Sequence, residues 1–161
     1  RARRDHHERG AELPTRMNTW RHWWPAVVWA GAIFFFSTGV FGGESTSRFI
    51  IPFLRWLLPE ASLETLSQLH FLIRKASHFG EYFLFSLLVL RGLRGEAGGW
   101  RWSWRGAALL IAAGYAALDE FHQSFVAGRG GAAQDVLLDC VGAAVAQASA
   151  RLWFGKSDNR K

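Results

Sequence analysis

The apolar residues of the chain gather in four long stretches that are separated by polar, Arg-rich segments. These stretches cover residues 23–41, 76–93, 106–125 and 133–154. A helix needs about 20 residues, at ~1.5 Å each, to cross ~30 Å of hydrocarbon. The pattern therefore predicts an all-α membrane protein, built as an antiparallel bundle of about four transmembrane helices with short loops.

Two shorter apolar runs, FIIPFLRWLLP and LETLSQLHFLI, lie between the first and second stretches. Each run is too short to cross a bilayer, so we expect interfacial helices there, lying on the membrane surface or folded over the bundle. Pro25 falls in the expected first turn of the first helix, where a missing N–H costs nothing.

The two ends of the chain differ from its middle in composition. Residues 1–22 are polar and basic, and we expect a disordered leader there. The bundle follows at residues 23–155, and a short basic tail occupies residues 156–161. Met17 is the single methionine and directly precedes the first apolar stretch, so it marks an alternative start of the protein.

Lys and Arg residues predict the orientation of the bundle. With the N-terminus inside, the cytoplasmic segments hold 14 of them and the outer segments hold five. This asymmetry favours a multi-pass protein of the cell membrane with both termini cytoplasmic. It also explains the net charge of +6 without nucleic acid, because the Arg residues flank apolar stretches instead of lining one helix face. Cys140 is the single cysteine, which excludes an internal disulfide.

Ionisable side chains interrupt the last three apolar stretches. Each costs at least ~2.5–3.5 kcal/mol in hydrocarbon, which makes it a functional candidate. Helical periodicity and the 1.5 Å rise place them on inward faces, in the outer half of the predicted bundle. The sequence therefore predicts one polar pocket there. The second stretch and its start supply Lys75, His78, Glu81 and Tyr82, the third Asp119, Glu120, His122 and Gln123, the fourth Asp135 and Asp139, and a Gly-rich turn Arg129.

Several of these polar residues also have simpler interpretations. Lys75 alone would extend its ammonium group to the membrane interface, and Glu81 alone would face the headgroups. His70 belongs to a predicted interfacial helix and is expected to lie at that interface. Gly142 and Ala146, four residues apart, are expected to form a close helix-packing seam. A purely structural ion-pair network is the alternative for the cluster as a whole.

The motifs RKASHFGEYF, DEFHQSFVAGR and QDVLLDCVG together resemble the VanZ-like family of small bacterial membrane proteins, which is named for a teicoplanin-resistance accessory protein. The resemblance covers about residues 33–150, including FFFSTG, and Asp139 stands where the family usually has Asn. It implies a place in the bacterial inner membrane, a link to the cell envelope and to glycopeptide resistance, and no particular reaction. The family pattern matches Lys75, His78, Glu81, Tyr82, Asp119, Glu120, Gln123, Arg129, Asp135 and Gly142.

The preferred hypothesis is an enzyme or a binding protein for an anionic envelope lipid or a peptidoglycan-related molecule. Lys75 and Arg129 would hold the anion, and His78 with Asp119 or Glu120 would act as acid and base. The candidate catalytic residues are His78, Glu81, Asp119 and Glu120. The candidate binding residues are Lys75, Tyr82, His122, Gln123, Arg129, Asp135 and Asp139.

Three alternatives accompany this hypothesis. The facing pairs His78/Glu81 and Asp119/His122 have the spacing of metal sites in helix bundles, but nearby cations would repel a metal, so we expect neither metal nor cofactor. A transporter or proton relay is disfavoured by the few helices and the absence of an internal repeat. A non-catalytic partner protein would use the cluster only to fix its fold or to dock another membrane protein. Whether the protein is an enzyme, and its oligomeric state, stay open.

Overall fold

The computed structural model describes residues 17–38, 43–97, 101–126 and 133–158, and its regular secondary structure over these residues consists of helices joined by short turns. Residues 1–16 and 159–161, which hold most of the expected leader and part of the expected tail, lie outside the described residues, as does Arg129. The all-α class is therefore confirmed for the described part of the chain. The helices are α1 (Met17–Phe36), α2 (Gly43–Leu57), α3 (Leu63–Arg94), α4 (Trp102–Gln123) and α5 (Ala133–Asp158).

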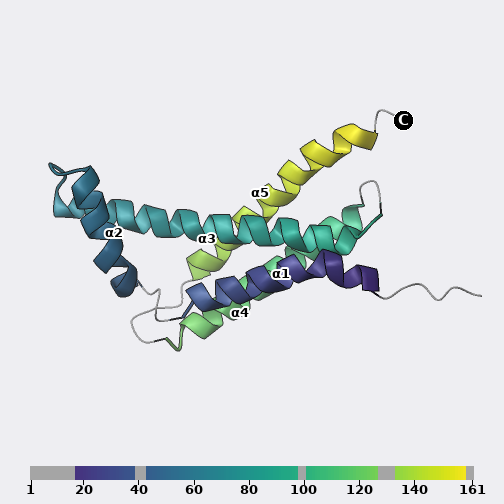
Figure 1. Cartoon of the computed structure of the whole chain (residues 1–161), viewed down its shortest axis with the longest axis horizontal. Coiled ribbons are helices and arrows are strands. Elements are labelled where there is room, and N and C mark those ends of the chain that lie inside the picture. Colours follow the sequence, from purple (N-terminus) through teal and green to yellow (C-terminus); the bar gives the residue numbers. More distant parts are fainter. Residues whose placement is uncertain (1–16, 39–42, 98–100, 127–132, 159–161) are drawn as a thin grey trace, which may run out of the picture.

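The α3 helix is the spine of the molecule, because it contacts each of the other four helices (Figure 1). It has 32 residues, a length of about 48 Å at the usual helical rise. The prediction of a separate interfacial helix for LETLSQLHFLI was wrong, since this run is the first third of α3. Its N-cap is Ser62, whose side chain accepts from the backbone N–H of Thr65. No proline follows inside α3, so nothing stops the helix before Gly95.

The α1 helix begins at Met17, earlier than the predicted residue 23, and Pro25 lies inside it rather than in its first turn. A proline in a helix interior leaves the carbonyl four residues earlier without its usual donor. Here that carbonyl belongs to Arg21, and the guanidinium of Arg91 in α3 donates to it at 3.3 Å. The tertiary contact thus replaces the hydrogen bond that Pro25 removes.

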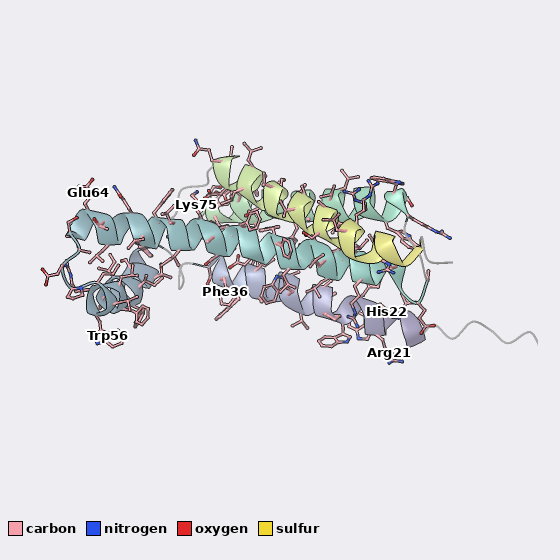
Figure 2. The ribbon with its side chains drawn as sticks, turned by 90° about the horizontal axis from the view of Figure 1, so that it is seen from above. Arg21, His22, Phe36, Trp56, Glu64 and Lys75 are labelled. Carbon is pink, nitrogen blue, oxygen red and sulfur yellow. The ribbon has the colours of Figure 1, made fainter. Side chains whose placement is uncertain are left out.

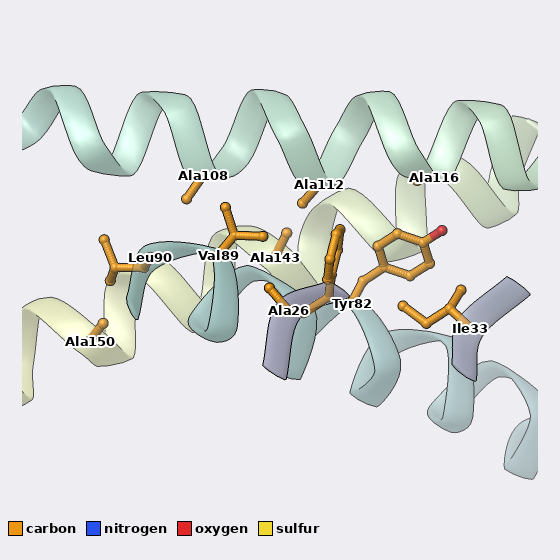
Figure 3. Close-up of a cluster of buried hydrophobic side chains, with 11 residues drawn as sticks. Ala26, Ile33, Tyr82, Val89, Leu90, Ala108, Ala112, Ala116, Ala143 and Ala150 are labelled. Carbon is orange, nitrogen blue, oxygen red and sulfur yellow. The ribbon is translucent and has the colours of Figure 1, made fainter. Parts of the chain in front are cut away.

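The core between α3, α4 and α5 combines small side chains on two helices with large ones on the third (Figure 3). Alanine lines the inward faces of α4 and α5, while α3 contributes Tyr82, Phe85 and Val89. The expected packing seam is confirmed: Ala146 is buried, and a Cβ added to Gly142 would lie 2.5 Å from the carbonyl oxygen of Phe79. Only a glycine allows α3 and α5 to approach this closely.

Large apolar side chains cover the outside of the bundle. Within the stretches that the structure describes, no helix combines the length and the sustained hydropathy that a membrane span requires. The α2 helix stands apart from the bundle, across the first turns of α3 (Figure 1). The exposed apolar side chains include Val28, Phe34, Phe35, Phe49, Phe53, Trp56, Leu110, Leu118, Phe121, Leu137, Val141 and Leu152.

Candidate functional site

Polar side chains from four helices meet at one end of the bundle. The antiparallel course of the chain brings the end of α1, the end of α4 and the start of α5 beside the middle of α3 (Figure 1). Three contacts carry this convergence: Lys75 with Asp135, His78 with Asp139, and Asp119 with α1. The structure thus brings together side chains that the sequence predicted to share a pocket.

Asp119 is the centre of a buried hydrogen-bonded group. Its Oδ2 atom accepts from Ser37 Oγ at 2.8 Å and from Gln123 Nε2 at 2.8 Å. The same amide nitrogen lies 3.3 Å from Ser37 Oγ. The spacing of Asp119 and Gln123, one helical turn, allows both to face α1. Ser37 was not among the predicted site residues; its signal in the sequence was a hydroxyl at the end of the apolar run FFFSTG.

His78 lies beside Asp139 and not beside Asp119 or Glu120. Its Nδ1 atom is 3.5 Å from Asp139 Oδ1, close enough for electrostatic attraction but without a hydrogen bond. The packing seam explains this pairing. Gly142 touches Phe79, and Asp139, almost a turn earlier on α5, therefore comes to lie opposite the neighbour of Phe79 on α3. The carboxylate that contacts His78 is thus Asp139 rather than Asp119 or Glu120, the partners considered from the sequence.

The ion pair of Lys75 and Asp135 forms a second link between α3 and α5. It lies one turn outward from His78 and Asp139. The Lys75 ammonium group is also 5.2 Å from the centre of the Phe71 ring. Both charges of the pair are partly exposed, and each is balanced by the other. This pairing ties Lys75 to α5 rather than leaving it as a free cation for a ligand.

Tyr82 is completely buried in the core, with its ring among Ile33, Ala112 and Ala116 (Figure 3). Its hydroxyl group has no hydrogen-bond partner among the described residues. Glu120 is also buried.

His122 leaves the cluster: its ring packs against Phe34 of α1, with the two ring centres 4.9 Å apart. Of the four predicted residues of α4, Asp119 and Gln123 therefore form the hydrogen-bonded group, and His122 faces another part of α1. His122 is half-buried there.

A cavity of about 160 Å³ opens on the other side of α3, toward α1 and α2. Figure 2 shows these two sides of α3, with Phe36 of α1 on one and Lys75 on the other. His78 and Glu81 are the predicted residues that reach the cavity. The lining residues are Phe36, Ser37, Thr46, Ile50, Ile73, Arg74, Ser77, His78 and Glu81.

Arg74 is the cation that lines this cavity, and it was not among the site residues predicted from the sequence. Among the side chains that the structure describes, none forms a hydrogen bond or ion pair with Arg74. The sequence held a signal, because Arg74, His78 and Glu81 follow one another at helical spacing and so share a face of α3. Lys75, the neighbour chosen in its place, points about 100° away.

His70 anchors α2 over the cavity. It is buried, not exposed at an interface as expected, and its Nε2 atom lies 3.2 Å from Thr46 Oγ1 of α2. Burial lowers the pKa of His70, and the positive charge of Arg74 lowers it further. The neutral imidazole is thus the form that the folded protein favours at this position.

The polar residues do not build a metal site within the described ranges. No three His, Cys, Asp or Glu side chains gather there closely enough to hold a metal ion. The histidines of the two facing pairs considered from the sequence contact different groups, since His78 contacts Asp139 whereas His122 contacts Phe34.

Comparison with known families places the chain with one of them. The model of the family described as VanZ/LLP1 matches residues 22–154, which is most of the chain and the range that contains the polar residues considered above. No curated protein and no solved structure matches the chain at a significant level.

Proposed function

Because the chain belongs to the VanZ/LLP1 family, we propose that it is a multi-pass protein of the bacterial cell membrane whose cavity binds the anionic part of an envelope molecule. In this proposal α1, α4, α5 and residues 76–93 of α3 cross the bilayer, and both termini are cytoplasmic. The cavity then opens toward the outer side of the membrane. Amphipathic α2 lies at the outer interface beside it.

The distribution of apolar and polar side chains supports the membrane part of the proposal. Large apolar residues such as Leu110, Leu118 and Leu137 are exposed. Buried positions hold Asp119, Asp139 and many alanines. A water-soluble bundle has the reverse distribution, with apolar side chains inside and polar ones outside. An exposed apolar surface of this extent requires an apolar surrounding or a partner.

The opposite end of the bundle supports the orientation. The guanidinium groups of Arg105 and Arg151 both lie 4.6 Å from the ring of Trp102. Trp102 is 61% exposed. Trp and Arg together are typical of the membrane–water interface, with Arg in excess on the cytoplasmic side.

The single observation that supports the binding function is the position of Arg74 in the wall of the cavity. A guanidinium group that lines a cavity without a described partner is suited to a phosphate or carboxylate, which it can bind with two parallel hydrogen bonds. Phe36, Ile50 and Ile73 form apolar walls beside it. Because Phe36 and Ile73 are also exposed at the outer surface, an amphiphile can keep its apolar part in the lipid while its anionic group reaches Arg74.

His78 gives the same cavity a capacity for acid–base chemistry. Its Nδ1 atom faces the buried carboxylate of Asp139, and the imidazole also lines the cavity. A carboxylate in this position orients a histidine and stabilises its protonated form. Binding is the primary function in this proposal, and proton transfer to or from the bound molecule would be added by His78.

The ion pair of Lys75 and Asp135 supports a structural role for part of the cluster. This is the element of the non-catalytic alternative that a specific contact favours, because the pair joins α3 to α5 away from the cavity. The structural role and the binding role predict different results for different residues. Substitutions at Lys75 should change stability, whereas substitutions at Arg74 should change binding.

The test is extraction of the protein with its native lipids, followed by mass spectrometry of the molecules that co-purify. We expect an anionic amphiphile with the native protein and at least a tenfold loss, roughly the value of one charge-assisted hydrogen bond, in Arg74→Gln. Arg48→Gln is the matched control, because Arg48 lies exposed on α2 and outside the cavity. Equal retention by Arg74→Gln and the control would refute the binding function. The same variants, expressed in cells exposed to teicoplanin, test the link to glycopeptide susceptibility.

A further inference from the structure

The polar groups of the cavity differ in the kind of hydrogen bond that they still offer. A hydroxyl group has one hydrogen to donate and two lone pairs to accept with, while a guanidinium group only donates. The two serines of the cavity have committed their hydrogens elsewhere. Ser37 donates to Asp119 Oδ2 at 2.8 Å, and Ser77 donates to the carbonyl of Ile73 at 3.0 Å.

Ser37 is the more constrained of the two hydroxyl groups. Gln123 Nε2 donates to one of its lone pairs at 3.3 Å, which leaves one lone pair. The orientation of the Gln123 amide is fixed by Asp119, because only the NH₂ end of an amide can bond to a carboxylate oxygen. Toward the cavity, Ser37 can therefore only accept a hydrogen bond.

Among the remaining polar residues of the lining, Thr46 and His78 can each donate or accept a hydrogen bond. Glu81 already interacts with other residues of the protein, so the accepting side of the cavity consists of Ser37 and Ser77. Arg74 only donates. A bare phosphate or carboxylate would satisfy Arg74 but would bring its own lone pairs against those of Ser37 and Ser77, which is unfavourable.

We propose that the molecule bound in this cavity is an anionic lipid whose headgroup also carries hydroxyl or amine hydrogens, as a glycerol phosphodiester does. The phosphodiester lies on Arg74, and the headgroup hydroxyls donate to Ser37 and Ser77. The apolar walls at Phe36 and Ile73 continue into the exposed apolar surface and take the first part of the acyl chains. This inference rests on the proposed function and specifies its ligand.

Two lipids test the proposal, because they share the charged phosphodiester and differ in the headgroup that it carries. Phosphatidylglycerol and phosphatidylmethanol have the same phosphodiester and the same charge, but the second has no headgroup hydroxyl. Dissociation constants are measured by native mass spectrometry of the full chain in detergent. We expect phosphatidylglycerol to bind about tenfold more tightly, the effect of one or two neutral hydrogen bonds.

Ser77→Ala is the decisive variant, since it removes an acceptor from the cavity without touching the buried Asp119 group. We expect it to reduce the preference for phosphatidylglycerol to about threefold or less and to leave phosphatidylmethanol unchanged. Ser149→Ala is the matched control, because Ser149 donates to the carbonyl one turn earlier in α5 just as Ser77 does in α3. Ser37→Ala removes the second acceptor of the cavity, and we expect it to reduce the preference for phosphatidylglycerol as well.

The results separate this inference from the function on which it rests. Equal binding of both lipids, with both lost in Arg74→Gln, would overturn the donor requirement and keep the anion site. Binding of neither lipid in an Arg74-dependent manner would overturn both. Competition by soluble glycerol 3-phosphate as strongly as by phosphatidylglycerol would overturn the assignment of the ligand to a lipid.

Discussion

The two sides of α3 carry similar residues, but one side is closely packed and the other borders a cavity. On the side of α5, Gly142 lies directly against the carbonyl of Phe79, and Gln147 donates to both oxygens of Ser86. On the side of α1 and α2, the helices leave a cavity of about 160 Å³. The closed side holds the bundle together, whereas the open side has room for a ligand.

Two adjacent cations illustrate what this difference means. Lys75 faces the closed side and is paired with Asp135. Arg74 faces the open side and makes no ion pair with any described residue. One residue of helical rotation, about 100°, thus separates the charge that links α3 to α5 from the charge that we propose binds a ligand. The following predictions test whether stability and binding divide along the same line.

The largest effect on stability is expected for Gly142→Ala. The new Cβ would lie 2.5 Å from the carbonyl oxygen of Phe79, and this backbone atom cannot rotate away. Overpacking of this kind costs roughly 1–3 kcal/mol or more, so we expect a loss near the upper end of that range. The free energy of unfolding in mild detergent is the measurement.

Gly80→Ala is the control for this substitution. A Cβ at Gly80 would meet nothing within 4 Å, and alanine is the better helix former by about 1 kcal/mol. Gly80→Ala should therefore be neutral or stabilising. An equally small effect of Gly142→Ala would show that the contact between α3 and α5 can relax, and the distinction between a closed and an open side would fail.

An intermediate effect is expected from one serine on each side of α3. Ser86→Ala removes a donor to the carbonyl of Ala143 and an acceptor for Gln147, two buried hydrogen bonds. The loss should be about 1–2 kcal/mol in the free energy of unfolding. Ser77→Ala loses one bond within its own helix at an exposed position and should cost less than about 0.5 kcal/mol. Equal losses for the two variants would contradict the comparison.

Much of the helical architecture could be predicted from the sequence, because apolar stretches of helical length are strong signals. The start of α3 could not, since its apolar pattern changes near Lys75 while the tendency to form a helix continues. Asp119 and Asp139 were identified as inward-facing from their periodicity alone. The family resemblance was confirmed by a match over residues 22–154.

The partners of these residues depended on contacts that periodicity does not contain. The pairing of His78 with Asp139 depends on the rotation of α5, which the contact of Gly142 with Phe79 sets. The role of Arg74 depends on α2, whose position over α3 no local pattern specifies. Helical faces were thus predictable, and the choice between two neighbouring faces was not.

The smallest expected effect concerns the attachment of α2, which covers part of the cavity on the open side of α3. The folded protein lowers the pKa of His70 below its ordinary value of 6.5, first through burial and then through Arg74. The stability from neutral His70 is therefore fully present above about pH 6.5 and is lost as the pH falls toward the lowered pKa. We expect amide exchange in α2, corrected for intrinsic rates, to rise a few-fold between pH 7.5 and pH 5.

Two variants sharpen the assignment of this effect to His70. His70→Asn cannot titrate, so its α2 should exchange at a rate independent of pH. Arg74→Gln removes the second cause of the lowered pKa, which should bring the pKa closer to 6.5 and reduce the loss at acid pH. An undiminished pH dependence in His70→Asn would mean that another group holds α2. The open side would then be closed by contacts other than the bond from His70 to Thr46.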